Sequence, residues 1–431
     1  MSDLIVQGGR PLAGRIVPSA NKNAVLPVLC ATLLTRRPLT LRGVPEITDV
    51  KKILQVFRAL GSRVEVEADG LLQLHHEATR FDEREHRLPQ EMRSSIMLVP
   101  PLLARFGVAR IERDVQGCSL GVREIDPHVE VFERFGARVE RTPDALVVRA
   151  DALQATDHWL DYASVTTTEN FVLCAALARG TSTLTNAASE PHVQEFCRFM
   201  QGLGARIEGI GTSRLAITGV DALGGGEFAF VEDFHEVVTF LALGAVTGGQ
   251  IGVRNGAPEQ FPLIDRTFAK FGVKVRHEGG WSTAEVPGGL RVVQPFTQNL
   301  LQKVEAAPWP YLPVDLLPIF IALGVRAEGS AMFWNKVYDG ALGWTAELSK
   351  FGAHAFLSDP HRVITFGGKP LVPAEVDSPY IIRVAIALLM LAASIPGRSI
   401  IRNATPIRRA HPRFVENLCS LGAQIEWTEA E

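Results

Sequence analysis

The chain has 431 residues, a length that predicts roughly two to four domains. Hydrophobic residues make up 46% and charged residues 21%, a composition that excludes a disordered chain, a coiled coil and a fibrous repeat. With 44 basic and 47 acidic residues the formal charge is −3. The chain therefore lacks the overall basic charge of a nucleic-acid-binding protein, and we expect no nucleic-acid partner.

The cysteines and the apolar segments indicate a cytoplasmic protein. The five cysteines are scattered and form no CxxC pair, which argues against a disulfide framework or a zinc site and favours a reducing compartment. The first residues do not combine a basic segment with a long apolar one, so we expect no signal peptide. The longest apolar run, residues 384–395, is too short to span a membrane and predicts a buried helix.

A short phrase, first seen as Leu60-Gly61-Ser62-Arg63-Val64-Glu65, occurs six times along the chain, in three close and three looser copies. An amphipathic segment precedes each glycine and alternating apolar residues follow it, which predicts a helix, a turn with positive φ and a strand. A second, nearly all-apolar helix is expected in each unit, for example over 24–34, 96–103 and 171–177, and such helices should be buried. The pattern alone leaves open a solenoid without catalytic function. The repeated glycines are residues 61, 136, 204, 272, 352 and 422.

The first candidate for chemistry is Asn21-Lys22-Asn23, directly before an apolar helix. Asn21 can cap that helix, and the free amides of its first turn together with Lys22 would attract an anion. The alternative is an ordinary capped helix with a solvated lysine.

The second candidate is the segment from Gln116 to His128, in which Gly117 and Gly121 bracket a small polar loop. The loop presents Cys118 five residues before an arginine, and a nearby cation lowers the pKa of a thiol and makes it reactive. The alternative is a buried and inert cysteine.

The third candidate is a set of arginines, of which Arg383 is the most informative because it interrupts the apolar run 380–386. A guanidinium in such surroundings needs an anionic partner or a wet cavity. Arg93 and the pair Arg408-Arg409 can also be explained as solvated surface charges.

These features together resemble the enolpyruvyl transferase family over the full chain, and most closely its UDP-N-acetylglucosamine 1-carboxyvinyltransferase branch. The most specific parts are Lys22-Asn23-Ala24, the Gly117-Cys118 to His128 segment and Ser164-Val165. The resemblance implies an α/β fold of two domains, each an inverted α/β prism of three repeated units, with the active site in the cleft between them. The first domain would comprise residues 21–229, and the second would comprise residues 1–20 plus 230–431.

The resemblance also implies a reaction and its residues. The enolpyruvyl group of phosphoenolpyruvate would move to a hydroxyl group of a uridine nucleotide, and phosphate would leave. Cys118 would donate a proton to the methylene carbon, Asp315 would receive the proton of the acceptor hydroxyl, and Lys22 would assist catalysis. No metal or redox cofactor is expected, because the cations supply the electrostatic stabilisation. Phosphoenolpyruvate would contact Lys22, Arg93, Arg123, Arg383 and Arg409, and the acceptor would contact Asn23, Arg123, Asp126, His128, Ser164, Val165, Thr166 and Asp315.

The sequence departs from the family pattern around the diphosphate and the sugar. Tyr162-Ala163 and Thr166 stand where the family has a lysine and a flexible glycine, and Ile381 stands where it has a second carboxylate, with Asp377 nearby but out of register. We therefore hypothesise a non-standard uridine nucleotide as acceptor, such as UMP, as in related enzymes of nucleoside-antibiotic biosynthesis. The alternatives are UDP-N-acetylglucosamine in peptidoglycan synthesis and a non-catalytic nucleotide-binding homologue. The sequence leaves the oligomeric state open.

Overall fold

The computed structural model describes residues 2–86, 88, 92–112, 124–297 and 299–429, and of Arg93 and Glu429 it describes the backbone only. The described chain divides into two compact units. Unit 1 contains residues 2–19 and 231–429, and unit 2 contains the described residues between 20 and 230. The chain thus passes from one unit to the other at residues 19–20 and returns at residues 230–231.

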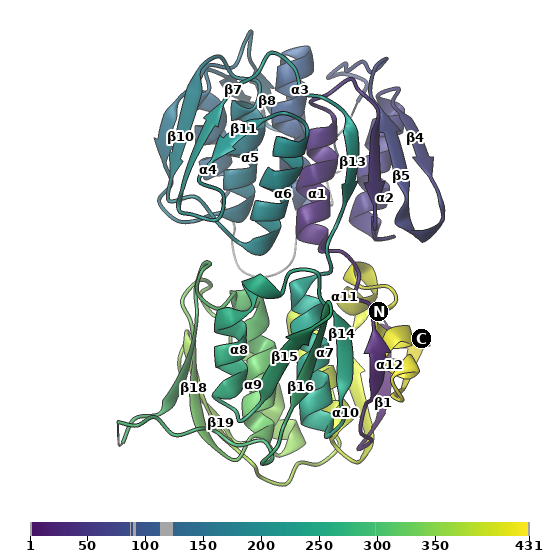
Figure 1. Cartoon of the computed structure of the whole chain (residues 1–431), viewed down its shortest axis with the longest axis vertical. Helices are drawn as coiled ribbons and strands as arrows, with labels where there is room; N and C mark the ends of the chain where they lie inside the picture. The colour runs from purple at the N-terminus through teal and green to yellow at the C-terminus, as the bar shows by residue number, and fades with distance from the viewer. Residues whose placement is uncertain (1, 87, 89–91, 113–123, 298, 430–431) are drawn as a thin grey trace. The chain divides into compact units, whose positions relative to one another are not determined.

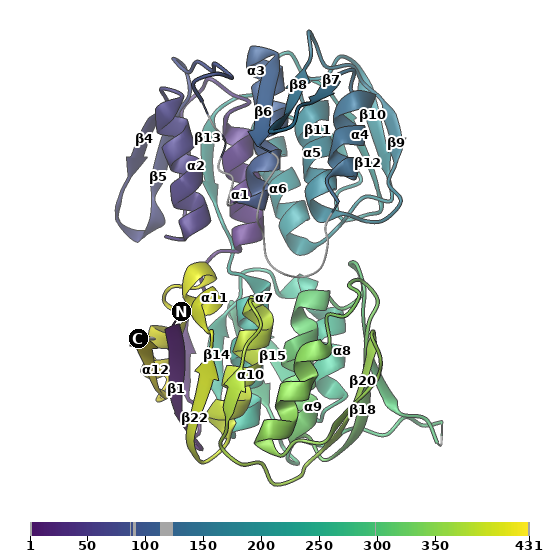
Figure 2. The same cartoon turned by 180° about the vertical axis from the view of Figure 1, so that it is seen from behind.

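Unit 2 packs its helices inside three sheets, as its purple-to-teal ribbon shows (Figures 1 and 2). Its helices are α1 (Lys22–Thr32), α2 (Thr48–Ala59), η1 (Ala68–Gly70), η2 (Arg93–Leu98), α3 (Val99–Phe106), α4 (Asp126–Arg134), α5 (Val165–Ala175) and α6 (Pro191–Gly202). Its first sheet has the order β13 (Gly226–Ala229), β3 (Leu39–Arg42), β5 (Leu72–His75), β4 (Arg63–Val66). The second is β6 (Val108–Glu112), β8 (Ala145–Arg149), β7 (Arg138–Arg141), and the third is β11 (Arg206–Glu208), β12 (Arg214–Thr218), β10 (Thr181–Thr185), β9 (Asp157–Trp159).

Unit 1 repeats this plan with three four-stranded sheets. Its helices are α7 (Phe234–Thr247), η3 (Pro258–Gln260), α8 (Pro262–Ala269), η4 (Val314–Leu316), α9 (Leu317–Arg326), η5 (Gly343–Phe351), α10 (Ile382–Ser394), α11 (Thr405–Ala410) and α12 (Phe414–Ser420). One sheet is β21 (Glu375–Asp377), β22 (Gly397–Arg402), β1 (Ser2–Gly8), β23 (Gln424–Glu429), so both chain ends lie in the same sheet (Figure 1). The others are β15 (Lys274–Glu278), β16 (Trp281–Glu285), β14 (Ile251–Arg254), β2 (Gly14–Ile16), and β17 (Gln302–Ala306), β18 (Gly329–Asn335), β20 (Arg362–Gly367), β19 (Ala355–Asp359).

The strand pairing recurs from repeat to repeat, as the repeated phrase predicts. Each of the five four-stranded sheets has two antiparallel pairs and one parallel pair at an edge. All six repeat glycines adopt positive φ, between 75° and 101°, a conformation that side-chain-bearing residues rarely adopt. Glycine at these places therefore ends the amphipathic helix of each repeat and lets the chain turn into the strand.

The apolar helices lie in the cores, as their composition predicts. Each unit has its own apolar core, and residues 384–394 form most of α10 and are all buried. One prediction was too short: the helix expected over 171–177 begins at Val165, because Ser164 caps a polar first turn that the apolar pattern does not reveal. Residues 96–103 form the end of η2 and the start of α3, where Pro100 and Pro101 occupy the first turn that tolerates proline.

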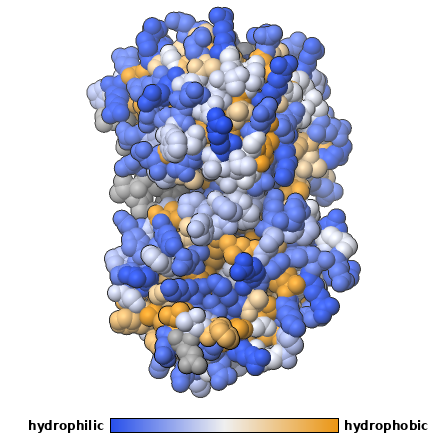
Figure 3. Space-filling model, turned by 60° about the vertical axis from the view of Figure 1, so that its left-hand side comes forward, coloured by the Kyte–Doolittle hydropathy of each residue, from blue (hydrophilic) through white to orange (hydrophobic). Residues whose placement is uncertain are grey.

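On the face drawn in Figure 3, hydrophilic and intermediate residues (blue and white) cover most of the surface, and hydrophobic residues (orange) cover the smaller part. Among the described residues, no helix combines the length and the apolar character needed to cross a bilayer.

Candidate active site

The N-terminal end of α1 carries Lys22 and Asn23. Asn21 precedes the helix, and its side-chain oxygen accepts a hydrogen bond from the backbone nitrogen of Asn23 at 2.9 Å. The Nζ of Lys22 lies 3.6 Å from Oδ2 of Asp49, and 26% of the Lys22 side chain remains exposed. Asn21 thus occupies the amides of Asn23 and Ala24, and the partly exposed Lys22 with the positive end of the helix dipole is what remains to attract an anion.

Arg383 lies in the first turn of α10 and has the anionic partner that its apolar surroundings require. Its Nη2 lies 3.5 Å from Oδ2 of Asp233, and the two side chains are 12% and 1% exposed. Burial alone would raise the pKa of Asp233, but His235, Arg383 and His411 together hold that pKa well below its usual value. The Nη1 of Arg383 has no hydrogen-bond partner among the described residues, so this edge of the guanidinium can bind an anion.

Arg409 lies in the last turn of α11, a helix that contacts α10. Its guanidinium carbon is 5.9 Å from the centre of the Tyr380 ring, and its Nη1 is 3.4 Å from the Tyr380 hydroxyl. This cation–π contact restrains the arginine without neutralising its charge. Two of the arginines assigned to phosphoenolpyruvate, Arg383 and Arg409, therefore lie on neighbouring helices of unit 1.

Asp315 belongs to η4, directly before α9, and its side chain is half-buried. In the part of the chain that the structure describes, its carboxylate has neither a hydrogen-bond nor an ion-pair partner. A carboxylate with free lone pairs can accept a proton from a bound hydroxyl group.

His128 contacts the first turns of α5 from the neighbouring helix α4. Its ring is 3% exposed, its Nδ1 lies 2.9 Å from Nδ2 of Asn170, and its Nε2 lies 3.4 Å from Oγ1 of Thr166. Ser164 caps α5 by accepting a hydrogen bond from the backbone nitrogen of Thr167. The structure thus brings together His128, Ser164 and Thr166, which the sequence analysis assigned to the acceptor, with Val165 in the same helical turn.

A groove of about 300 Å³ lies beside this cluster in unit 2 and includes Tyr162 and Ser164. Among the described residues, one arginine lines it, Arg141, whose Nη2 lies 3.4 Å from Oδ1 of Asp126. Burial lowers the pKa of His158, which also lines the groove, so this histidine is neutral at pH 7. The described residues that line the groove therefore carry net negative charge, and the acidic ones are Glu124, Asp126, Glu130, Glu133 and Asp161.

Behind the same helix turn, α5 buries Glu169 with 1% of its surface exposed. Burial, and secondly the charge of Glu190, raise the pKa of Glu169 well above its usual value. The core around Glu169 therefore favours the protonated, uncharged form of this carboxyl group.

Some of the assigned residues lie outside the structural description. Cys118 and Arg123 fall in residues 113–123, which are outside the described residues, and the side chain of Arg93 is outside them as well. Their roles stay predictions.

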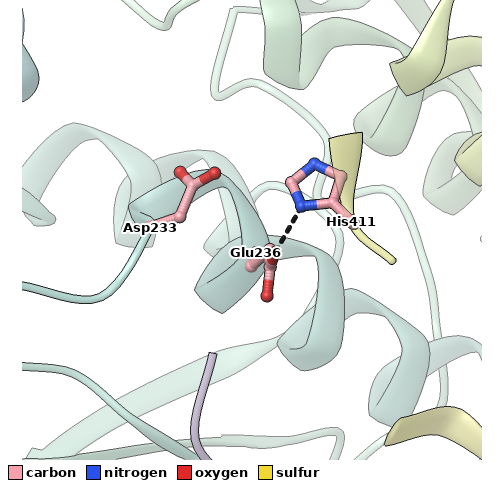
Figure 4. A group of neighbouring side chains, drawn as sticks. All are labelled: Asp233, Glu236 and His411. Atoms are coloured by element: carbon pink, nitrogen blue, oxygen red, sulfur yellow. Dashed lines mark ion pairs between the residues drawn. The ribbon is translucent and has the colours of Figure 1, made fainter. Parts of the chain in front are cut away.

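The structure also assembles a cluster that the sequence analysis did not assign to the site. Ligand atoms of Asp233, Glu236 and His411 all lie within 4.8 Å of one another, and the three residues are buried (Figure 4). A signal was available, because Asp233 and Glu236 are acidic residues at the start of the otherwise apolar segment 234–247. The sequence could not identify His411 as their partner.

The sequence of the chain matches a known family. The model of EPSP synthase (3-phosphoshikimate 1-carboxyvinyltransferase) matches residues 6–418. A UDP-N-acetylglucosamine 1-carboxyvinyltransferase of Treponema denticola is 37% identical over 430 residues, with 100% of both chains covered. An enzyme of the same name from Bradyrhizobium diazoefficiens is 37% identical over 422 residues, covering 98% of this chain and 97% of the relative.

Solved structures agree on the fold. The enolpyruvyl transferase NikO from Streptomyces tendae superimposes with a TM-score of 0.87 at 24% identity, covering 100% of this chain and 99% of that one. EPSP synthase from Acinetobacter baumannii gives a TM-score of 0.79 at 16% identity with complete coverage of both chains. The α/β fold expected from the repeats and the resemblance is thereby confirmed. The chain belongs to the EPSP synthase family and is a phosphoenolpyruvate-dependent enolpyruvyl (carboxyvinyl) transferase.

Proposed function

We propose that this enzyme transfers the enolpyruvyl group to a hydroxyl group of a uridine nucleotide that is not the usual UDP-sugar, with UMP as the first candidate. The charge of the groove beside Ser164 carries this proposal. Of the residues that the structure describes, five carboxylates and one arginine line that groove, and Tyr162 stands where the family pattern has a lysine. A second phosphate would be repelled by the carboxylates and would lack its cation, whereas a monophosphate has less charge to place there.

The proposed chemistry proceeds by addition and elimination. Cys118 protonates the methylene carbon of phosphoenolpyruvate, while the acceptor oxygen forms a bond to the neighbouring carbon and its proton passes to Asp315. The product of this step is a tetrahedral ketal. The bond to the phosphate oxygen then breaks, phosphate leaves, and a proton is removed from the new methyl group to restore the double bond.

The cations stabilise the charges of these steps in the proposed mechanism. Lys22, Arg123 and Arg409 bind the phosphate and carboxylate groups, and Arg93 and Arg383 complete the positive surroundings. The free edge of Arg383 and the partial exposure of Lys22 support these assignments.

The test measures phosphate release from phosphoenolpyruvate with UMP and, separately, with UDP-N-acetylglucosamine, together with the masses of the products. Release with UMP alone, and a product heavier by one enolpyruvyl group, is the expected result. Efficient release with the UDP-sugar would overturn the proposed acceptor. If no phosphate is released with either compound or with a wider panel of uridine nucleotides, the acceptor is not a uridine nucleotide.

The second candidate acceptor is UDP-N-acetylglucosamine itself. It is favoured by the relatives of that name, which are 37% identical to this chain along almost its whole length. In that case the hydroxyl groups of Tyr162 and Thr166 would replace the missing lysine and glycine as diphosphate contacts.

A further inference from the structure

The cluster in Figure 4 belongs to a larger polar network that the proposed chemistry does not use. The side chains of Glu236 and His411 are 3% and 5% exposed and form an ion pair between Oε1 and Nδ1. Ser19 completes this part of the network, because its Oγ donates to Oε1 of Glu236 at 2.6 Å and its backbone nitrogen donates to Oε2 at 3.2 Å. Both carboxylate oxygens of Glu236 are therefore occupied.

This network joins both chain passages between the units. Ser19 is the last residue of unit 1 before the chain enters unit 2, and Val231 is the first residue after it returns. The backbone nitrogen of Asp233 donates to the carbonyl oxygen of Ser19 at 2.8 Å. The outgoing and the returning segments are thus fastened to each other within unit 1.

The same network reaches the two helices that carry the arginines. Asp233 pairs with Arg383 of α10. His411 is the first residue after α11, and its backbone nitrogen donates to the carbonyl oxygen of Ile407 at 2.8 Å. Through His411, Glu236 is therefore connected to the short helix whose last turn contains Arg409.

A metal site is the competing interpretation, since Asp, Glu and His are common ligands. The contacts argue against it. Asp233 already accepts a hydrogen bond from the ring of His235 at 2.9 Å and pairs with Arg383, while Glu236 is held by Ser19 and His411. A divalent cation would have to displace these donors and approach a guanidinium, which costs electrostatic energy.

We propose that Glu236 is a positioning residue for Arg409: by holding His411 against the chain passage at Ser19, it fixes the orientation of α11. The helix has only 6 residues, too few to be stable without such tertiary contacts. The expected effect on substrate binding rests on the proposed function, in which Arg409 binds an anionic group of phosphoenolpyruvate. The orientation of α11 itself is independent of the substrate.

The test compares Glu236→Gln and Glu236→Ala with a matched control, Asp265→Asn. The control removes the charge of another Asp–His contact in unit 1, in which Oδ2 of Asp265 lies 3.0 Å from Nε2 of His277. Hydrogen–deuterium exchange of the free enzymes should show faster exchange in residues 405–413 of both Glu236 variants, and no such change there in Asp265→Asn. Unchanged exchange at 405–413 in both Glu236 variants would overturn the proposal.

The kinetic arm measures KM for phosphoenolpyruvate, KM for the acceptor and kcat. A lost hydrogen bond to a charged carboxylate, worth about 1.5 kcal/mol, corresponds to about a tenfold higher KM for phosphoenolpyruvate in Glu236→Gln, with the KM for the acceptor within about twofold. A double-mutant cycle with His411→Asn should show non-additive effects on that KM, because the two residues act through one contact. Equal changes in both KM values, or additive effects, would contradict a positioning role.

Failure of the proposed function and failure of the positioning role give different results. If the wild-type enzyme consumes no phosphoenolpyruvate with any acceptor, the proposed function fails, while the exchange experiment still decides the positioning role. If Arg409→Lys leaves the KM for phosphoenolpyruvate unchanged, the assigned role of Arg409 fails. One equivalent of zinc or another divalent metal in the purified wild-type protein, lost in Glu236→Gln, would replace the positioning role by a metal site.

Discussion

Placing a lysine at position 162, where the family pattern has one, should raise the preference of the enzyme for UDP-N-acetylglucosamine over UMP. In the Tyr162→Lys variant, an ammonium group occupies a position that is now a half-exposed aromatic side chain, 53% exposed, at the rim of the acidic groove. The substitution adds one positive charge to a groove whose described lining holds five carboxylates and one arginine. We expect it to favour the acceptor with the larger negative charge, because the attraction grows with the charge of the ligand.

The size of the effect follows from the exposure of this position. An ammonium and a phosphate about 4 Å apart attract each other by about 1 kcal/mol in water and by about 4 kcal/mol at the effective dielectric constant of a protein surface. Because position 162 is half-exposed, we expect a value near the lower limit, about 1–2 kcal/mol. This corresponds to a rise of about 5- to 30-fold in the ratio of kcat/KM for UDP-N-acetylglucosamine to kcat/KM for UMP.

The assay measures phosphate release with each acceptor at saturating phosphoenolpyruvate. Tyr162→Phe is the control for loss of the hydroxyl group, and it should leave the ratio unchanged. Asp161→Asn removes one repulsive charge without adding a cation, so it should raise the ratio by only about twofold. The effect of Tyr162→Lys should shrink as ionic strength rises from about 0.05 M to about 0.5 M, since salt screens exposed charges.

Two results would refute this reasoning. One is a ratio that changes no more in Tyr162→Lys than in Tyr162→Phe, which would mean that the groove does not contact the second phosphate. The other is an equal gain for both acceptors, which would mean that the lysine acts on a group common to both nucleotides.

Three other predictions concern catalysis and stability. Cys118→Ser should lower turnover by orders of magnitude while nucleotide binding, followed by calorimetry, stays largely intact; unchanged turnover would exclude the thiol as proton donor. Glu169→Gln should fold normally and gain stability over the wild type as the pH rises above about 4.5, because only the wild type must keep a buried carboxyl protonated; urea unfolding at pH 6 and pH 8 checks this, and a destabilised variant at pH 8 would contradict it. Burial lowers the pKa of His76 to about 3, so between about pH 6.5 and pH 3 the unfolded chain binds a proton that the folded chain does not. Stability should therefore fall as the pH drops through this range, and His76→Gln should lose less of its own stability over the same range; an equal loss would assign the acid sensitivity to other groups.

The sequence by itself determined the repeated architecture. Gly61 and its five counterparts stand where a helix must end with positive φ, and only glycine adopts that conformation without strain. The apolar run 384–395 has too few polar residues for an exposed helix, so its burial in α10 was predictable. These conclusions need only local chemistry, since backbone conformation and apolar periodicity are properties of a few consecutive residues.

Tertiary structure alone decided which charged residues meet. The apolar surroundings of Arg383 required an anion, but its partner Asp233 lies 150 residues earlier in the chain. Likewise, the polar residues that begin α5 look like a loop in the sequence, but Ser164 caps a helical turn there and His128, on another helix, hydrogen-bonds to Thr166. A charged or hydroxyl side chain in an apolar stretch of sequence predicts that the folded protein must supply a partner for it. Only the packing of distant segments identifies that partner, because it depends on the path of the whole chain.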